Sequence, residues 1–145
     1  MDEAGDWVAK CAIAELVTRY AALNDAGDWE AVASLYVEDG RMSRPAAPDD
    51  FIMGRSAILE SFRARPPRVA RHIVANVLVT LIGQGRASAT SQILLFTGSP
   101  SPHGGPPVLS GLAPLVGSYR DQLICTEQGW RFAERRGSLD FGVPK

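Results

Sequence analysis

Residues 20–40 have the sequence YAALNDAGDWEAVASLYVEDG, which contains the clearest helix boundaries of the chain. Its first part ends an amphipathic pattern over residues 7–23, in which apolar residues recur at steps of three and four, as on one face of a helix. Gly27 is a natural helix stop, and Asp28 is a good N-cap for a second helix over residues 29–36. We therefore predict two helices that meet at a tight polar corner.

Short elements follow this corner. The tripeptide Glu-Asp-Gly at 38–40 indicates a turn, and residues 41–44 and 51–53 indicate short strands on either side of a Pro/Asp-rich link. Ser56 is a suitable N-cap for a third helix, which the prolines at 66–67 must stop.

The chain changes to β character after residue 67. Residues 71–83 and 86–98 are long β-branched runs with a glycine turn between them, which predicts a long hairpin. Residues 98–111 are rich in Gly, Pro and Ser and indicate a loop, and two more strands are expected in 117–127 and 129–141. Helices first and strands afterwards predict an α+β fold with a mostly antiparallel sheet, because parallel strands would need helices between them.

Both faces of the strand at residues 72–82 are expected to be apolar. Alternation along the strand puts Ile73, Val77, Val79 and Leu81 on one face and Val74, Leu78 and Ile82 on the other. A strand covered on both faces suits a sheet that packs on helices inside and on another subunit outside. We therefore expect a homodimer.

The length and charge of the chain narrow the function. Its 145 residues predict one domain over 1–145, and a net charge of −1 gives no basic excess for a nucleic-acid partner. The acidic start is unlike a signal peptide and no apolar run could span a membrane, so we expect a cytoplasmic protein. Cys11 and Cys125 form no ligand cluster; we expect two buried, reduced thiols and no metal.

The order of these segments resembles the SnoaL-like branch of the nuclear-transport-factor-2-like superfamily. The resemblance rests on residues 20–40, on RHIVANVLV at 71–79 and on YRDQLICTEQGWRFAERR at 119–136. It implies a cone in which a curved antiparallel sheet wraps around three N-terminal helices and encloses a small-molecule pocket. Scytalone dehydratase and bile-acid dehydratase are members in which an Asp and a His meet inside the cone.

The resemblance also implies site residues. Asp25 and His72 fall where those lyases keep their Asp and His, and Tyr20 resembles the tyrosine of bile-acid dehydratase, whereas scytalone dehydratase has its tyrosine at the position of Asn24. The next long strand, at 86–96, lacks the second pocket histidine of scytalone dehydratase. The arginine of a related dehydrochlorinase falls near Cys125 or Thr126.

The chemistry of this pair follows from its residue types. The pKa of an imidazole, roughly 6.5, lies near the working pH, so His72 suits a general base that removes a proton from carbon. Asp25 would orient the ring and stabilise its protonated form, and Tyr20 could donate a hydrogen bond to a developing oxyanion. The alternatives are a solvated turn for Asp25, a surface position for His72 and core packing for Tyr20.

Other residues are candidates for substrate binding. They are Asn24 and Trp29 at the corner, and Arg135 and Arg136, which should point to opposite faces of a regular strand. The arginines at 63, 65, 68 and 71 could attract an anion, although a solvated face is the more common outcome for such a run. His103, in a Pro/Gly-rich segment, is expected to be inert.

Three functions fit the sequence. The first is a cofactor-free lyase or isomerase, dehydratase-like, acting on a hydrophobic small molecule. The second is a non-catalytic small subunit of a ring-hydroxylating dioxygenase, or a ligand-binding module. The third is a polyketide cyclase or epoxide hydrolase, because one cone fold hosts many chemistries.

Overall fold

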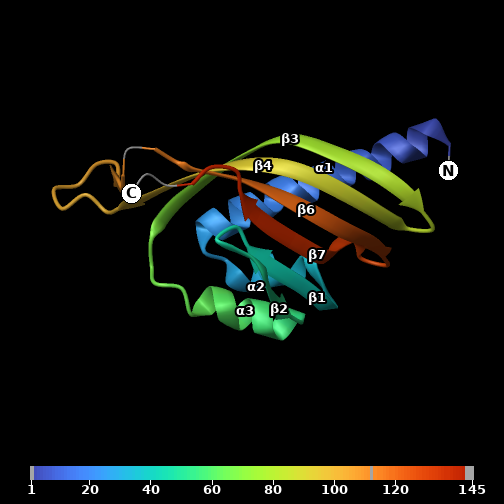
Figure 1. Cartoon of the computed structure of the whole chain (residues 1–145), viewed down its shortest axis with the longest axis horizontal. Helices are drawn as coiled ribbons and strands as arrows, with labels where there is room; N and C mark the ends of the chain where they lie inside the picture. Colours follow the sequence, from blue (N-terminus) through green and yellow to red (C-terminus); the bar gives the residue numbers. More distant parts are fainter. Residues whose placement is uncertain (1, 112, 143–145) are drawn as a thin grey trace.

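The computed structural model describes residues 2–111 and 113–142 and has the predicted α+β architecture, with three helices against a curved, unclosed sheet (Figure 1). The helices are α1 (Glu3–Ala26), α2 (Trp29–Ser34) and α3 (Arg55–Arg63). The strands are β1 (Tyr36–Arg44), β2 (Ala47–Met53), β3 (Val69–Gly83), β4 (Arg86–Ser99), β5 (Val108–Leu109), β6 (Leu115–Thr126) and β7 (Gly129–Leu139). The cone predicted from the resemblance is confirmed.

The corner between α1 and α2 forms as its sequence predicts. Gly27 ends α1 in the left-handed conformation, with φ of 70°, which glycine adopts without steric cost. The Asp28 side chain then accepts a hydrogen bond from the Ala31 amide, 3.2 Å away, and caps α2. Helix α2 ends at Ser34, earlier than expected, because Tyr36 already begins β1.

The region between α2 and α3 differs from the prediction in two places. Residues 38–40 do not form a turn but continue β1, which pairs with β2 on one side and with β7 on the other. Ser56 does not cap α3, since that position belongs to Gly54, which makes no side-chain cap hydrogen bond.

The sheet has the strand order β2-β1-β7-β6-β4-β3, with β5 added beside β4. The hairpin of β3 and β4 and the neighbouring pair of β6 and β7 are antiparallel, as predicted, whereas β1 and β7 run parallel. Strand β5 lies within the segment 98–111, which the sequence predicted to be a loop throughout.

A bulge in β3 changes which side chains face the core. The pairing with β4 shifts between Ala75 and Leu78, and Asn76 has a positive φ of 53°. Alternation therefore restarts at this point. Val74 points inward together with His72, and Val77, Val79 and Leu81 also point inward. The sequence placed Ile73 on the same face as Val77, Val79 and Leu81, and Val74 on the same face as Leu78 and Ile82, and this grouping was wrong. The exposed outer row of β3 is Ile73, Leu78 and Ile82.

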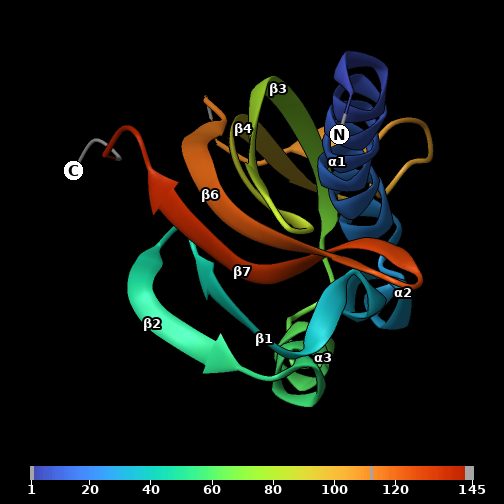
Figure 2. The ribbon, with the colours of Figure 1, turned by 90° about the vertical axis from the view of Figure 1, so that its right-hand side faces the viewer.

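Helix α1 packs against β3 at the edge of the sheet, and α2 and α3 lie together near β1 (Figure 2). The core fills the space between the helices and the inner face of the sheet. Its fully buried members include Ile13, Val17, Val32, Tyr36, Ile58, Phe62, Leu123 and Phe132. The packing of α1 on β3 brings the last turn of the helix beside the first residues of the strand.

Two further expectations concern the surface. Cys11 and Cys125 are both exposed free cysteines, so the prediction of two buried thiols was wrong. Each lies on the solvent side of its element, Cys11 on α1 and Cys125 near the end of β6. None of the described helices is long and apolar enough to cross a membrane.

Candidate active site

Asp25 and His72 meet at the junction of α1 and β3. The Oδ1 atom of Asp25 lies 2.5 Å from Nδ1 of His72, and its Oδ2 accepts a hydrogen bond of 2.8 Å from the His72 backbone amide. The two side chains are only 12% and 8% exposed. One carboxylate thus holds both the ring and the backbone of His72.

The position of Asp25 is unfavourable for a helix taken alone. A carboxylate in the last turn opposes the helix dipole, at a cost of about 0.3–1 kcal/mol. The two hydrogen bonds to His72 offset this cost, because bonds to a charged acceptor are among the stronger ones in proteins. The contact with His72, and not the stability of the helix, explains an aspartate at this position.

The contact also fixes the state of the imidazole. A carboxylate can only accept hydrogen bonds, so Nδ1 carries the proton and Nε2 remains an acceptor. Burial lowers the pKa of His72 below its ordinary value of 6.5, while Asp25 raises it and the nearby Arg68 and Arg65 lower it. At neutral pH the ring is therefore uncharged and able to take up a proton.

Tyr20 lies in the same part of the cone, one α1 turn before Asn24. Its hydroxyl accepts a hydrogen bond of 3.2 Å from the Tyr36 hydroxyl, which leaves the Tyr20 proton free to be donated. Burial raises the pKa of Tyr20, so this proton is retained. The arrangement suits a hydrogen-bond donor and not a base.

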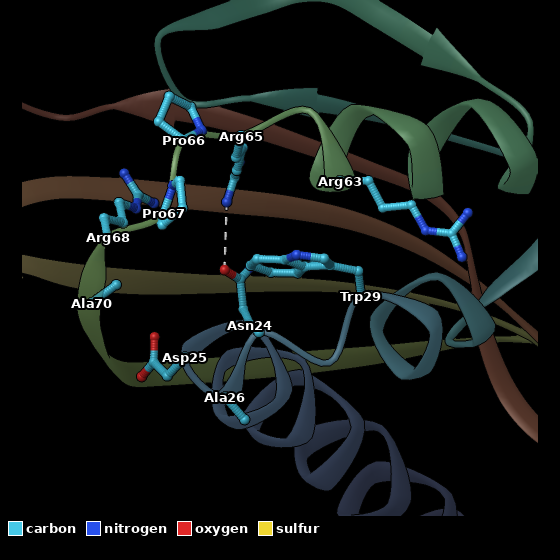
Figure 3. Close-up of a pocket in the computed structure, with 11 residues that line it drawn as sticks. Asn24, Asp25, Ala26, Trp29, Arg63, Arg65, Pro66, Pro67, Arg68 and Ala70 are labelled. Carbon is cyan, nitrogen blue, oxygen red and sulfur yellow. Dashed lines mark hydrogen bonds between the residues drawn. The ribbon is translucent and has the colours of Figure 1, made fainter.

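Two cavities adjoin these residues. A small inner cavity of about 50 Å³ is lined by Tyr20, Asn24, His72 and Tyr119 among others. An outer cavity of about 370 Å³ lies between the end of α1, Trp29 and the segment that joins α3 to β3 (Figure 3). Asp25 lines the outer cavity and His72 the inner one, so the pair lies at their border.

Asn24 and Trp29, both predicted to bind substrate, line these cavities. Asn24 borders both, and its Oδ1 accepts a long hydrogen bond of 3.4 Å from Arg65 (Figure 3). The Trp29 indole stacks on Phe62, with ring centroids 5.4 Å apart, and presents an aromatic wall to the outer cavity.

Arg135 points into the cone but is already engaged. Its Nε lies 3.0 Å from Oδ1 of Asp121, its Cα partner on β6, and both residues are 1% exposed. The guanidinium carbon lies 4.3 Å from the ring centroid of Tyr20, 3.8 Å from that of Tyr119 and 4.7 Å from that of Phe132. Arg135 therefore supports the two tyrosines that line the inner cavity.

Arg136 faces the other way, as alternation along a strand requires. It donates to the Pro48 carbonyl and to the Asp49 carboxylate on β2. Neither arginine lines the two cavities described above, and the substrate-binding role expected of them stays a prediction.

The sequence reasoning did not predict several residues of the cavity walls, among them Tyr119 and Arg44 of the inner cavity. Arg65 and Arg68, which the sequence analysis considered for anion binding, line both cavities. The inward alternation of β6 was a usable signal for Tyr119. The run of arginines was identified in the sequence, but the turn and bend at residues 64–65, which precede Pro66, were not.

Within residues 2–111 and 113–142, no three His, Cys, Asp or Glu side chains lie close enough together to hold a metal ion. Asp25 and His72 contact each other instead.

Residues 8–136 match the SnoaL-like domain family. The chain belongs to this family. The SnoaL-like domain thus covers nearly all of the elements that build the cone, from α1 to β7. No curated protein is similar enough in sequence to be matched to the chain.

Solved structures with the same fold include three from Novosphingobium aromaticivorans. An NTF2-like protein with a cystatin-like fold is 25% identical, with a TM-score of 0.76 over 94% of this SnoaL-like chain and 85% of its own. A protein provisionally named a scytalone dehydratase is 22% identical, with a TM-score of 0.75 over 96% and 91%. One provisionally named an aromatic ring hydroxylase is 22% identical, with a TM-score of 0.74 over 94% and 92%.

Proposed function

We propose that this SnoaL-like domain is a cofactor-free lyase or isomerase, dehydratase-like, that acts on a hydrophobic small molecule. The observation that carries the proposal is the contact between Asp25 and His72 at the border of the two cavities. A neutral, buried imidazole with a fixed tautomer is suited to take a proton from carbon at neutral pH.

The proposed reaction needs only groups of the chain. Nε2 of His72 removes a proton from the carbon next to a carbonyl, and the electron pair moves toward the carbonyl oxygen. Tyr20 donates a hydrogen bond to that oxygen as negative charge develops there. A hydroxyl on the neighbouring carbon then leaves with the proton from His72 as water, a double bond forms, and the imidazole is neutral again.

The experiment uses hydrophobic cyclic β-hydroxy ketones, whose dehydration gives conjugated enones that are followed by their ultraviolet absorption. We expect His72→Gln and Asp25→Asn each to lower kcat by about 10²–10⁴, the usual contribution of general acid–base catalysis. Asp28→Asn is the matched control: it removes a carboxylate three residues away, and asparagine is an equally good N-cap. Turnover that persists in His72→Gln would overturn the proposal.

A second function is favoured by the likeness to the ring-hydroxylase structure. In that case the chain would be the small subunit of a ring-hydroxylating dioxygenase, and catalysis would take place on a larger partner. The two functions are separated by purification from the native cell: a stoichiometric complex with an iron–sulfur protein supports the second, and isolated enzyme with dehydratase turnover supports the first.

A further inference from the structure

Three arginines on the cavity walls have no carboxylate partner among residues 2–111 and 113–142. Arg44 comes from the end of β1, and Arg65 and Arg68 come from the segment between α3 and β3. The carboxylate on the same walls, Asp25, is committed to His72. The walls therefore carry an excess of positive charge beside an apolar and aromatic interior.

The sequence between the helix and the strand directs this charge. Arg65 and Arg68 flank Pro66 and Pro67, whose rings fix the backbone. Figure 3 shows the Arg65 side chain extended toward Asn24, with Arg68 beyond the prolines. Both arginines line the inner and the outer cavity, so they lie where the two meet.

Most hydrogen-bonding capacity of Arg65 is unused. A guanidinium has five N–H donors, and within the described part of the chain those of Arg65 make only the long 3.4 Å bond to Asn24, while its carbon lies 4.6 Å from the Phe62 ring centroid. Burial lowers the pKa of Arg65, and the like charges of Arg44 and Arg68 lower it further. An anion between these groups would relieve both the repulsion and the lack of partners.

We propose that Arg44, Arg65 and Arg68 form an anion subsite and that the substrate is a hydrophobic carboxylic acid whose carboxylate binds there, with its reacting carbon toward His72. The planar guanidinium matches a carboxylate in a two-point contact. The carboxylate serves as an anchor that orients the substrate and does not activate the carbon. The apolar part of the acid would contact Trp29 and Tyr119 on the cavity walls. The placement of the reacting carbon rests on the function proposed above, whereas the anion subsite does not.

The test compares the binding of benzoate with that of benzamide, which has the same shape and no charge, by isothermal titration calorimetry. We expect benzoate to bind at least tenfold more tightly at low salt, and the difference to shrink as salt screens the arginines. Arg65→Gln and Arg68→Gln should each weaken benzoate binding by about tenfold and leave benzamide unchanged, since a bond to a charged group is lost. Arg71→Gln is the matched control, because Arg71 is exposed on the face of β3 opposite His72.

Equal affinity for benzoate and benzamide, or loss of benzoate binding in Arg71→Gln alone, would overturn the inference. Tighter binding of phenyl phosphate than of benzoate would replace the carboxylate by a phosphate ester and overturn the substrate class. Calorimetry measures benzoate binding by the arginines, and turnover of the β-hydroxy ketones measures the dyad, so failure of the anion subsite and failure of the catalytic dyad are measured separately. The thermal unfolding midpoint of each variant shows that it is folded.

Discussion

Two opposing influences act on the imidazole of His72, and their balance can be measured. Burial has the larger effect and lowers its pKa, whereas the hydrogen bond and the charge of Asp25 raise it. Asp25→Asn removes the carboxylate charge and weakens the hydrogen bond, so the pKa should fall further below 6.5. We expect a ¹H–¹³C NMR titration to show this downward shift.

The same titration carries a consequence for stability. The pKa of His72 is lower in the folded state than in the unfolded chain. At pH values between these two pKa values, the unfolded chain therefore binds more protons than the folded protein. The stabilising contribution of the neutral ring is therefore complete above pH 6.5 and is lost as the pH falls through the folded-state pKa. A titration of His72 above pH 6.5, or an upward shift in Asp25→Asn, contradicts this reading of the site.

Individual site residues differ in how far the sequence could predict them. Asp25 was predictable because a carboxylate in the last turn of a helix is unfavourable without a partner. The resemblance indicated that His72 is this partner. Arg65 was predicted as part of a basic run that could attract an anion, with a solvated face as the more common outcome. Its place on the cavity wall depends on the backbone turn and bend at residues 64–65, which no periodicity in the sequence indicates.

Among the elements, β3 depends on the bulge at Asn76 for its two faces. A non-glycine residue with φ of 53° is strained unless it is Asn or Asp, which tolerate this conformation better than most. Asn76→Val should reduce the free energy of unfolding by about 1–2 kcal/mol, whereas Asn76→Gly should change it little. Ala75→Val, at an exposed and extended neighbouring position, is the control and should be neutral. Urea unfolding measures all three.

A second outcome follows from the geometry of the bulge. Deleting Asn76 leaves Val74 and Val77 one residue apart, so simple alternation keeps both of them inward together with His72. We therefore expect the deletion variant to fold with a straighter β3. An unfolded deletion variant would contradict this expectation and show that the extra residue is needed for the packing of β3 on α1.

Elements with strong local signals were predicted well, and those defined by their neighbours were not. The corner at Gly27 and the hairpin of β3 and β4 carry their own turn residues. Residues 38–40 lie between two pairs of β1 with β7, Tyr36 with Phe132 and Arg41 with Glu134, and the bulge in β3 is defined by its register with β4. Such long-range requirements override the local preference of Glu-Asp-Gly for a turn.

At the scale of the whole molecule, the outer face of the sheet carries an apolar row on β3. Leu78 is 71% exposed, Ile82 57% and Ile73 48%, and Leu94 lies beside Ile73 in the pairing of β3 with β4. Large apolar patches of this kind commonly mark protein interfaces. The predicted homodimer remains a proposal, with this face as the contact between two copies.

The oligomeric state tests that proposal directly. We expect the wild-type chain to have twice its formula mass by size-exclusion chromatography with light scattering, and the Leu78→Glu/Ile82→Glu variant to be a monomer. Met53→Glu is the control, because Met53 is 61% exposed but lies on β2 at the other edge of the sheet. A monomeric wild type, or dissociation by Met53→Glu alone, contradicts the assignment of this face.

The buried pair of Asp121 and Arg135 limits how this protein can evolve. Loss of either partner alone leaves an uncompensated charge under the tyrosines, a change that typically costs about 3–5 kcal/mol. Joint replacement of both residues by apolar residues is often neutral for stability, so we expect substitutions at positions 121 and 135 to occur together. Related sequences should therefore either retain both charged residues or have replaced both, and few of them should carry only one.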